Sequence, residues 1–301
     1  MSNTLIKQIP FLSNCKEVIA IKKGFSSDDK YLIHMPDGNK KLLLRMFNIE
    51  ELRSKKTIYS ILKRMQNYHV TCSKPLAIGE AGNRGYMITS YIEGKDAEDE
   101  ISNYTVQDQF NIGLEAGREL KKMHALSAPH QMSSWYSRKI EKHKKYLDAY
   151  AACEVNVIKD QKIIDFIEEN TPLMKQRPNI FQHDDFHLGN IIVNNKKFAG
   201  IIDFDRYDWG DPIHEFLKVG IFSREVSIPF SIGQIKGYFN NKDPEEDFWR
   251  LYSLYLAMCV FSTVIWTLKT KPNMINEMLN KVYVYLEDHD YFDRLKPKWY
   301  L

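Results

Sequence analysis

The sequence predicts an α+β fold with two lobes, in which a small antiparallel sheet is followed by a larger, mainly helical lobe. The first ninety residues alternate β-like segments with turns and contain one helix-like stretch. Beyond Gly94 the apolar residues recur at helical spacing. The 301 residues, 44% of them hydrophobic, are enough to fill two cores. We therefore expect one lobe at 1–93 and another at 94–301, with a hinge at about residues 90–94.

Three β-like segments open the chain, at residues 17–22, 30–34 and 40–47. The turn after the first contains glycine and serine, whose backbone N–H and hydroxyl groups can cover phosphate oxygens because glycine permits a close approach. The residues expected to do so are Gly24, Ser26 and Ser27. An ordinary hairpin turn has the same composition, so that alternative stays open.

A helix at 54–67 and a further strand at 85–91 complete the predicted first lobe. The next helix carries an apolar stripe that ends at His124, where we expect a buried histidine with a packing role. Thr105 and Asp108 form the signal that caps the start of this helix.

Composition and the N-terminus indicate a cytoplasmic protein without a membrane span. The first residues lack the long apolar core of a signal peptide. The uncharged stretch Leu251–Leu268 approaches the length that spans a bilayer, but its scattered Ser, Thr and Tyr favour a buried core helix. Four cysteines lie too far apart in sequence to indicate a disulfide framework or a metal site: Cys15, Cys72, Cys153 and Cys259.

The segment from 181 to 205 carries the residues that phosphoryl transfer requires. A carboxylate must orient the attacking hydroxyl and accept its proton, and oxygen ligands must hold the Mg²⁺ that neutralises a triphosphate. Asp185 suits the first task, and Asn190 and Asp203 suit the second. Four residues separate Asp185 from Asn190, so one tight loop can carry both. The apolar runs 190–193 and 198–202 predict a hairpin that ends at Asp203.

These residues resemble the hallmark of the aminoglycoside phosphotransferase and choline kinase family, which shares the protein kinase fold. The matching stretches are His183-Asp184-Asp185-Phe186-His187-Leu188-Gly189-Asn190, Ile202-Asp203-Phe204 and Gly210-Asp211-Pro212. Asp184 stands where the family usually has Gly, which makes the choice of base less automatic, but the spacing to Asn190 favours Asp185. The resemblance covers nearly the whole chain and implies a bilobal protein-kinase-like fold with Mg²⁺ as cofactor and ATP or GTP as co-substrate.

The resemblance also implies roles for residues of the first lobe. Arg45 stands where kinases place the strand lysine that binds the α- and β-phosphates, although it could instead reach the sheet edge. Its usual glutamate partner is missing from helix 54–67, which keeps a nucleotide-binding pseudokinase open as the alternative from another class. The hinge residues expected to bind the nucleotide base through their backbone are Ser90, Tyr91 and Ile92.

Other polar residues near the motif are expected to support it. In this fold the loop histidines, His183 and His187, brace the loop, and Asp211 is expected to accept N–H bonds from it. Asp205 and Asp208 are expected to be turn or solvent residues.

The acceptor is the least determined part of the prediction. The resemblance implies a hydroxyl of a small molecule, first an aminoglycoside-type antibiotic, with a macrolide or a metabolite such as choline or a sugar as alternatives. Glu215 and the C-terminal Trp299-Tyr300-Leu301 are pocket candidates. A net charge of +3 is the wrong bias for steering polycations. The basic run 138–145 is expected to be a solvated helix face with no role in nucleic-acid binding. Monomer and homodimer both stay open.

Overall fold

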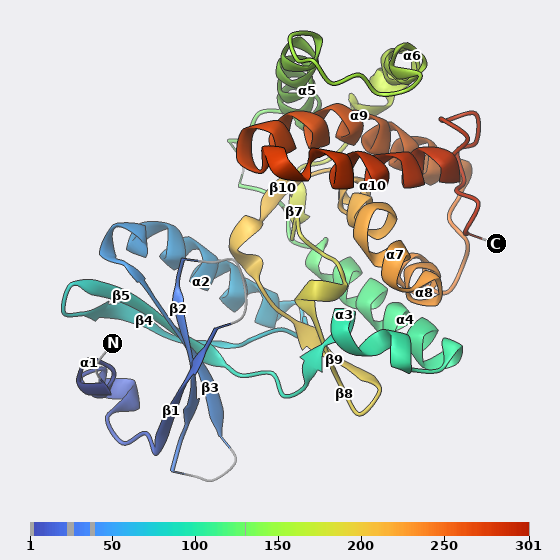
Figure 1. Ribbon diagram of the computed structural model, residues 1–301. Helices are drawn as coiled ribbons and strands as arrows, with labels where there is room; N and C mark the ends of the chain where they lie inside the picture. Colours follow the sequence, from blue (N-terminus) through green and yellow to red (C-terminus); the bar gives the residue numbers. More distant parts are fainter. Residues whose placement is uncertain (1–2, 23–26, 37–39, 130, 301) are drawn as a thin grey trace. The chain divides into compact units, whose positions relative to one another are not determined.

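The computed structural model describes residues 3–22, 27–36, 40–129 and 131–300, and the chain divides into two compact units (Figure 1). The first unit holds the antiparallel sheet and the second holds most of the helices, so the predicted α+β fold is confirmed. The first unit comprises Met1–Lys95, Ile192–Asn194 and Ala199–Asp205, and the second comprises Asp96–Ile191, Asn195–Phe198 and Arg206–Leu301.

A five-stranded antiparallel sheet forms the first unit, in the order β1-β2-β3-β5-β4. Its strands are β1 Glu17–Ile21, β2 Asp29–His34, β3 Lys41–Asn48, β4 Pro75–Ala81 and β5 Arg84–Ser90. The strand β3 lies between β2 and β5, with Leu44 opposite both Tyr31 and Ile88. Leu42, Leu44 and Met46 alternate along β3 and are buried, because a strand turns every second side chain to the same face.

Two helices accompany the sheet, α1 Asn3–Lys7 and α2 Leu52–Asn67. Before α2, the Asn48 side chain accepts a hydrogen bond from Glu50 N and begins a 3₁₀ turn, Ile49–Glu51. The helix therefore starts two residues earlier than the sequence pattern predicts. Ile58, Ile61 and Met65 are buried at helical spacing along its length.

The predicted hairpin is present as β8 Ile191–Asn194 and β9 Lys197–Ile201, and β6 Lys95–Asp96 pairs with β8. Its two turn residues, Asn195 and Lys196, have φ of 49° and 61°, the left-handed values that a two-residue hairpin turn requires. Most of the hairpin groups with the first unit, which the prediction of two contiguous lobes missed. Gly94 has φ of 143°, and a Cβ there would lie 2.3 Å from Val193 O.

The second unit is mainly helical. Its helices are α3 Ala97–Glu100, α4 Val106–Met123, α5 Trp135–Ala151, α6 Asp160–Asn170, α7 Arg224–Val226, α8 Ile228–Tyr238, α9 Glu246–Thr270 and α10 Ile275–Asp288. Its two short strands, β7 Ile180–Gln182 and β10 Asp208–Gly210, pair antiparallel. Thr105 caps α4 by accepting from Asp108 N, as the sequence predicts. Helix α4 packs against α8 (Figure 1).

Helix α9 is long and apolar enough by composition to cross a membrane, and 72% of its most apolar window is buried inside the protein. Tyr252 and Tyr255 on this helix are fully buried. This burial is what the prediction of a core helix over Leu251–Leu268 requires. Trp299 and Tyr300 are also buried, and the Tyr300 ring packs edge-on against Trp249 at 4.7 Å. The C-terminal aromatic residues are therefore core residues, which corrects their prediction as pocket residues, while Leu301 lies outside the described residues.

Candidate active site

The loop between β7 and β8 carries the predicted catalytic residue. Phe186 and Leu188 are buried and anchor the loop. Asp185, which lies between β7 and Phe186, is only half-buried. The backbone folds back on itself, because His187 N donates to Asp185 O at 3.1 Å and Asn190 N donates to His187 O at 2.9 Å. The loop is thereby fixed with the Asp185 carboxylate on its accessible side.

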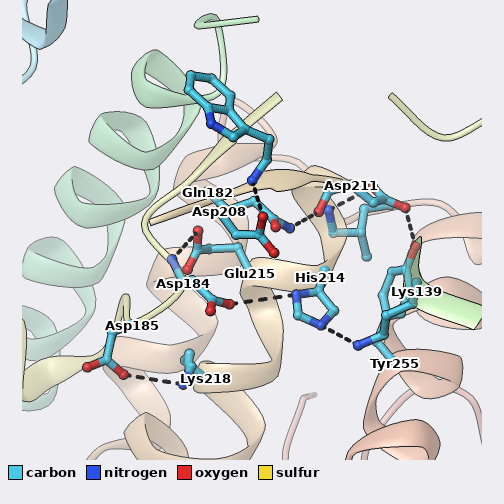
Figure 2. Close-up of polar contacts among 12 residues, drawn as sticks. Lys139, Gln182, Asp184, Asp185, Asp208, Asp211, His214, Glu215, Lys218 and Tyr255 are labelled. Atoms are coloured by element: carbon cyan, nitrogen blue, oxygen red, sulfur yellow. Dashed lines mark hydrogen bonds and ion pairs between the residues drawn. The ribbon is translucent and has the colours of Figure 1, made fainter. Parts of the chain in front are cut away.

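Two cations and a histidine lie beside the Asp185 carboxylate. Lys218 Nζ donates to Oδ1 at 3.2 Å (Figure 2). His187 Nε2 lies 3.6 Å from Oδ1, and Arg206 Nε lies 4.0 Å from Oδ2. Burial raises the pKa of Asp185. Lys218, His187 and Arg206 lower this pKa by a larger amount, so it lies below its ordinary value. The carboxylate is therefore ionised at neutral pH and can accept a proton or a hydrogen bond.

Asn190 lies beside Asp185, as the spacing of the two residues predicts. Its side-chain Nδ2 donates to Asp185 O at 2.8 Å and to Asp185 Oδ2 at 3.3 Å. Because the amide nitrogen is engaged in this way, the amide oxygen is the atom that Asn190 can offer to a cation. The loop thus joins a carboxylate and a neutral oxygen ligand in one rigid turn.

The backbone conformation at Asp184 is one that glycine, the usual residue of the resembling family at this position, adopts easily. Its φ is 61°, in the left-handed region that glycine adopts freely and aspartate tolerates. Its backbone N–H donates to Glu215 Oε2 at 3.2 Å. Burial, with repulsion from Glu215 as the next cause, raises the pKa of the Asp184 carboxyl to about 6. Asp185 is therefore the more acidic of the two neighbouring carboxyl groups.

Buried polar residues hold the loop and its supporting strands. The His187 Nδ1 accepts from Gly189 N at 3.1 Å, and the His183 ring packs edge-on against Phe186 at 5.9 Å. The Asp211 carboxylate is fully buried and accepts bonds from Arg177, Tyr255 and Ile213 N. The sequence predicts that Asp211 accepts hydrogen bonds from the catalytic loop. Among the described residues, its carboxylate instead accepts them from donors outside that loop.

Glu215 is a support and not the pocket residue that the sequence analysis considered. Its side chain is fully buried, accepts from Asp184 N, and has His124 Nε2 3.9 Å away. Burial raises the pKa of Glu215, but His124, His183 and the Asp184 N–H outweigh this and lower it. His124 also bonds Tyr238 through Nδ1 at 2.9 Å, so it is a buried, hydrogen-bonded histidine as expected.

In the first unit, Arg45 belongs to a buried cluster of two cations and two carboxylates. Arg45 Nε donates to Asp28 Oδ2 at 2.8 Å, and its Nη2 pairs with Asp205. Lys55 on α2 bonds the same two carboxylates, at 2.9 Å to Asp28 and 3.3 Å to Asp205. The acidic partners of Arg45, which helix 54–67 lacks, are thus Asp28, just before β2, and Asp205, two residues after Asp203. Asp205 is a half-buried ion-pair partner, which corrects its prediction as a turn or solvent residue.

The neighbouring opposite charges favour the ionised forms of Arg45 and Asp205. Burial alone lowers the pKa of Arg45, but Asp205 and Asp28 raise it above its ordinary value. Burial raises the pKa of Asp205, and Arg45 and Lys55 reverse this and lower it. Asp203 is exposed and has φ of 63°. An exposed carboxylate is suited to bind a metal ion.

The remaining predicted nucleotide contacts lie in two places. Gly24 and Ser26 are outside the described residues, and Ser27 is exposed. At the hinge, Ser90 N donates to Lys74 O at 2.8 Å and Tyr91 N donates to Lys41 O at 3.2 Å. The sheet therefore uses these two N–H groups. Among the described residues, Ile92 N has no backbone acceptor of this kind, and its binding to a nucleotide base stays a prediction.

A cavity of about 160 Å³ adjoins the catalytic loop in the second unit, and sequence reasoning missed it. Lys139 and Lys218 line it together with Asp184 and His214. Lys139 comes from the basic run 138–145, which was expected to be a solvated helix face. Lys139 instead faces inward, which corrects that prediction in part. His214 and Lys218 are four residues apart in the sequence. In a helix this spacing places two side chains on the same face, so it could have indicated that both line one cavity.

The comparisons with known proteins concern the family and the fold. A family model described as the phosphotransferase enzyme family matches residues 17–252. Aminoglycoside phosphotransferase APH(2'')-Ib, ADP-bound, has a TM-score of 0.67 at 15% identity, with 100% of both chains covered. The gentamicin complex of APH(2")-IIa has a TM-score of 0.65 at 16% identity, covering 94% of this chain and 96% of the other.

A third structure, a thermostable mutant of aminoglycoside phosphotransferase APH(4)-Ia, has a TM-score of 0.68 at 13% identity, covering 95% and 98% of the two chains. The chain matches none of the curated proteins. At these identities the structures establish the shared protein-kinase-like fold.

Proposed function

Because the chain belongs to the phosphotransferase enzyme family, we propose that it is a Mg²⁺-dependent kinase that transfers the γ-phosphoryl group of ATP or GTP to a hydroxyl of a small molecule. The observation that supports this best is the ionised Asp185 carboxylate, fixed beside Asn190 in one loop. Phosphoryl transfer needs mainly positioning and electrostatic stabilisation, and such a carboxylate provides the acceptor's orientation.

In the proposed reaction, Asp185 accepts a hydrogen bond from the acceptor hydroxyl and takes its proton as the oxygen attacks. A bond forms between that oxygen and the γ-phosphorus, and the bond from the γ-phosphorus to the β–γ bridging oxygen breaks. The nucleoside diphosphate leaves with the electron pair of that bond. Lys218 keeps Asp185 ionised before the transfer, and Arg206 adds a second positive charge at 4.0 Å.

Asn190 and Asp203 carry the ligands that this proposal assigns to a magnesium ion. Asn190 offers an amide oxygen and Asp203 an exposed carboxylate, both of them oxygen ligands that Mg²⁺ prefers. Among the described residues there is no group of three or more His, Cys, Asp or Glu placed to hold a metal ion. When bound with the nucleotide, Mg²⁺ supplies positive charge to the phosphates.

Arg45 and Lys55 supply the protein's own positive charge for the phosphates in this proposal. The reason for keeping a pseudokinase open was the lack of an acid partner for Arg45, and Asp28 and Asp205 now fill that role. The wide spacing of the four cysteines in the sequence fits the proposed cytoplasmic location.

The aminoglycoside acceptor has support from the sequence resemblance and from the distant structures, two of which hold gentamicin or streptomycin. The lysine side chains in the cavity weigh against a polycation. Macrolides, choline and sugars remain the other acceptors to test.

The experiment is a coupled assay of nucleoside diphosphate formation with Mg²⁺, ATP or GTP, and a panel of hydroxylated compounds. We expect turnover that depends on the acceptor and stops when Mg²⁺ is chelated. Nucleotide binding without turnover for any acceptor, measured by calorimetry, would favour the pseudokinase. Failure to bind either nucleotide would refute the proposal.

A further inference from the structure

The cavity beside the catalytic loop limits the size of what it can hold. Its volume is about 160 Å³. A cavity of about 150 Å³ in another protein holds one benzene ring, so this one accepts on the order of six to ten heavy atoms. A compound of several sugar rings exceeds that. The cavity therefore fits a small molecule or one end of a larger one.

The charged groups that line the cavity are mostly cationic. Lys139, Lys142 and Lys218 contribute ammonium groups, and Asp184 contributes the carboxyl group. Burial lowers the pKa of the two lining histidines, that of His143 to about 4 and that of His214 well below its ordinary value, and the lysines lower both further. Both imidazoles are therefore neutral at pH 7, and three lysines face one acidic side chain.

Lys139 lines the cavity and forms no ion pair among the described residues. Within the part of the chain that the structure describes, no carboxylate lies within 4 Å of its Nζ, which instead donates to His214 Nε2 at 2.7 Å (Figure 2). The Nζ also lies 5.6 Å and 5.8 Å from the ring centroids of Trp135 and Tyr255. Burial, and then repulsion from Lys142, lower the pKa of Lys139 to about 8. A half-buried ammonium held in this way gains from an anionic ligand.

Lys218 connects the cavity to the catalytic residue. It lines the cavity and its Nζ lies 3.2 Å from Asp185 Oδ1. Asp184, the neighbour of Asp185 in the chain, also lines the cavity. The Lys218 side chain thus reaches from the cavity to the carboxylate that is proposed to take the acceptor's proton.

We infer that the acceptor is a small hydroxylated anion, whose carboxylate or phosphate group binds at Lys139 and Lys142 while its hydroxyl faces Asp185. This inference rests on the proposed function and names the substrate class for the same site. The transfer balances as described above, with the hydroxyl proton passing to Asp185 and the nucleoside diphosphate leaving.

The test compares acceptors that differ only in the anionic group. D-Glycerate and sn-glycerol 3-phosphate are matched with glycerol, gluconate is matched with sorbitol, and gentamicin represents the polycations. We expect kcat/KM to be at least tenfold higher for an anion than for its neutral partner. Comparison of the carboxylate compounds with the phosphate compound shows which of the two anionic groups the cavity binds. Higher kcat/KM for gentamicin or for the neutral partners would overturn the inference while leaving the proposed kinase function intact.

A substitution of Lys139 tests whether the anion binds at this residue. Lys139→Met should raise KM for the preferred anion at least tenfold and change KM for the nucleotide less than twofold. Lys144→Met, on the exposed side of the same helix, is the matched control and should change neither. An unchanged KM for the anion in Lys139→Met would contradict the assignment.

A second measurement does not depend on turnover. Acetylation of Lys139 in the wild-type protein at pH 8, followed by mass spectrometry, should be slowed at least fivefold by millimolar glycerate, glycerol phosphate or gluconate. Spermidine and glycerol should give no protection. Protection by spermidine, or by none of the anions, would refute the anion site even if nucleotide binding and turnover establish the kinase.

Discussion

Asp184 shows how a single residue can carry both a backbone cost and an electrostatic cost. Its left-handed φ of 61° suits glycine better than aspartate. Its carboxyl faces Glu215, with Asp208 as a further negative charge and with Lys218 and Lys139 opposing them. The repulsion and the burial raise its pKa to about 6, so ionisation of Asp184 destabilises the folded state.

The pH dependence of stability follows from this pKa. The unfolded chain loses the Asp184 proton near pH 4 and the folded protein near pH 6, so the group lowers stability as pH rises from about 4 to 6. Asp184→Asn should remove this loss. Because the side chain is 37% exposed, we expect a gain of only about 1 kcal/mol, or roughly 2–4 °C in Tm, at pH 8.

Thermal unfolding at pH 4 and pH 8 checks this prediction. The wild type and Asp184→Asn should differ by much less at pH 4 than at pH 8. Asp165→Asn, at an exposed position of α6, provides the matched control and should give equal shifts at both pH values. A gain for Asp184→Asn that is the same at both pH values would show that its charge is not the cause.

The helices α4 and α8 cross at their backbones, because glycines line both sides. A Cβ on Gly117 would lie 2.0 Å from Gln234 O, and one on Gly237 would lie 2.1 Å from Leu114 O. Gly113 and Gly233 make similar approaches. Backbone atoms cannot move aside like the end of a flexible side chain, so the helices must separate if a methyl group is added.

Gly117→Ala should therefore destabilise the protein although alanine favours helices. Overpacking of this kind costs about 1–3 kcal/mol, which exceeds the gain of up to about 1 kcal/mol in helix propensity. Asn111→Ala, exposed on the same helix, is the control and should be neutral or slightly stabilising. The free energy of unfolding in urea measures both. A Gly117→Ala variant as stable as the wild type would contradict the close crossing.

Most elements could be predicted because their signals are local. The stripe of α4, its Thr105 cap and the turn between β8 and β9 each depend on residues that are neighbours in sequence. The same is true of Asp185 and Asn190, which one loop brings together. The grouping of the hairpin with the first unit depends on packing between distant segments, and no pattern in the hairpin itself could reveal it.

At the scale of the whole molecule, the charged and polar pairs described above join residues that lie far apart in the sequence. Lys139 and His214 meet across 75 residues of chain, and Arg45 meets Asp205 across 160. No spacing rule links such pairs, so the cavity cations and the partners of Arg45 could not be predicted.

The most direct test of the proposed function is the rate of phosphoryl transfer by Asp185→Asn to the best acceptor of the panel. Loss of a general base of this kind lowers kcat by about 10²–10⁴-fold, and the affinity for nucleotide, measured by calorimetry, should change less than twofold. Asp165→Asn should retain the wild-type rate. A kcat for Asp185→Asn within about threefold of the wild type would show that Asp185 is not the base.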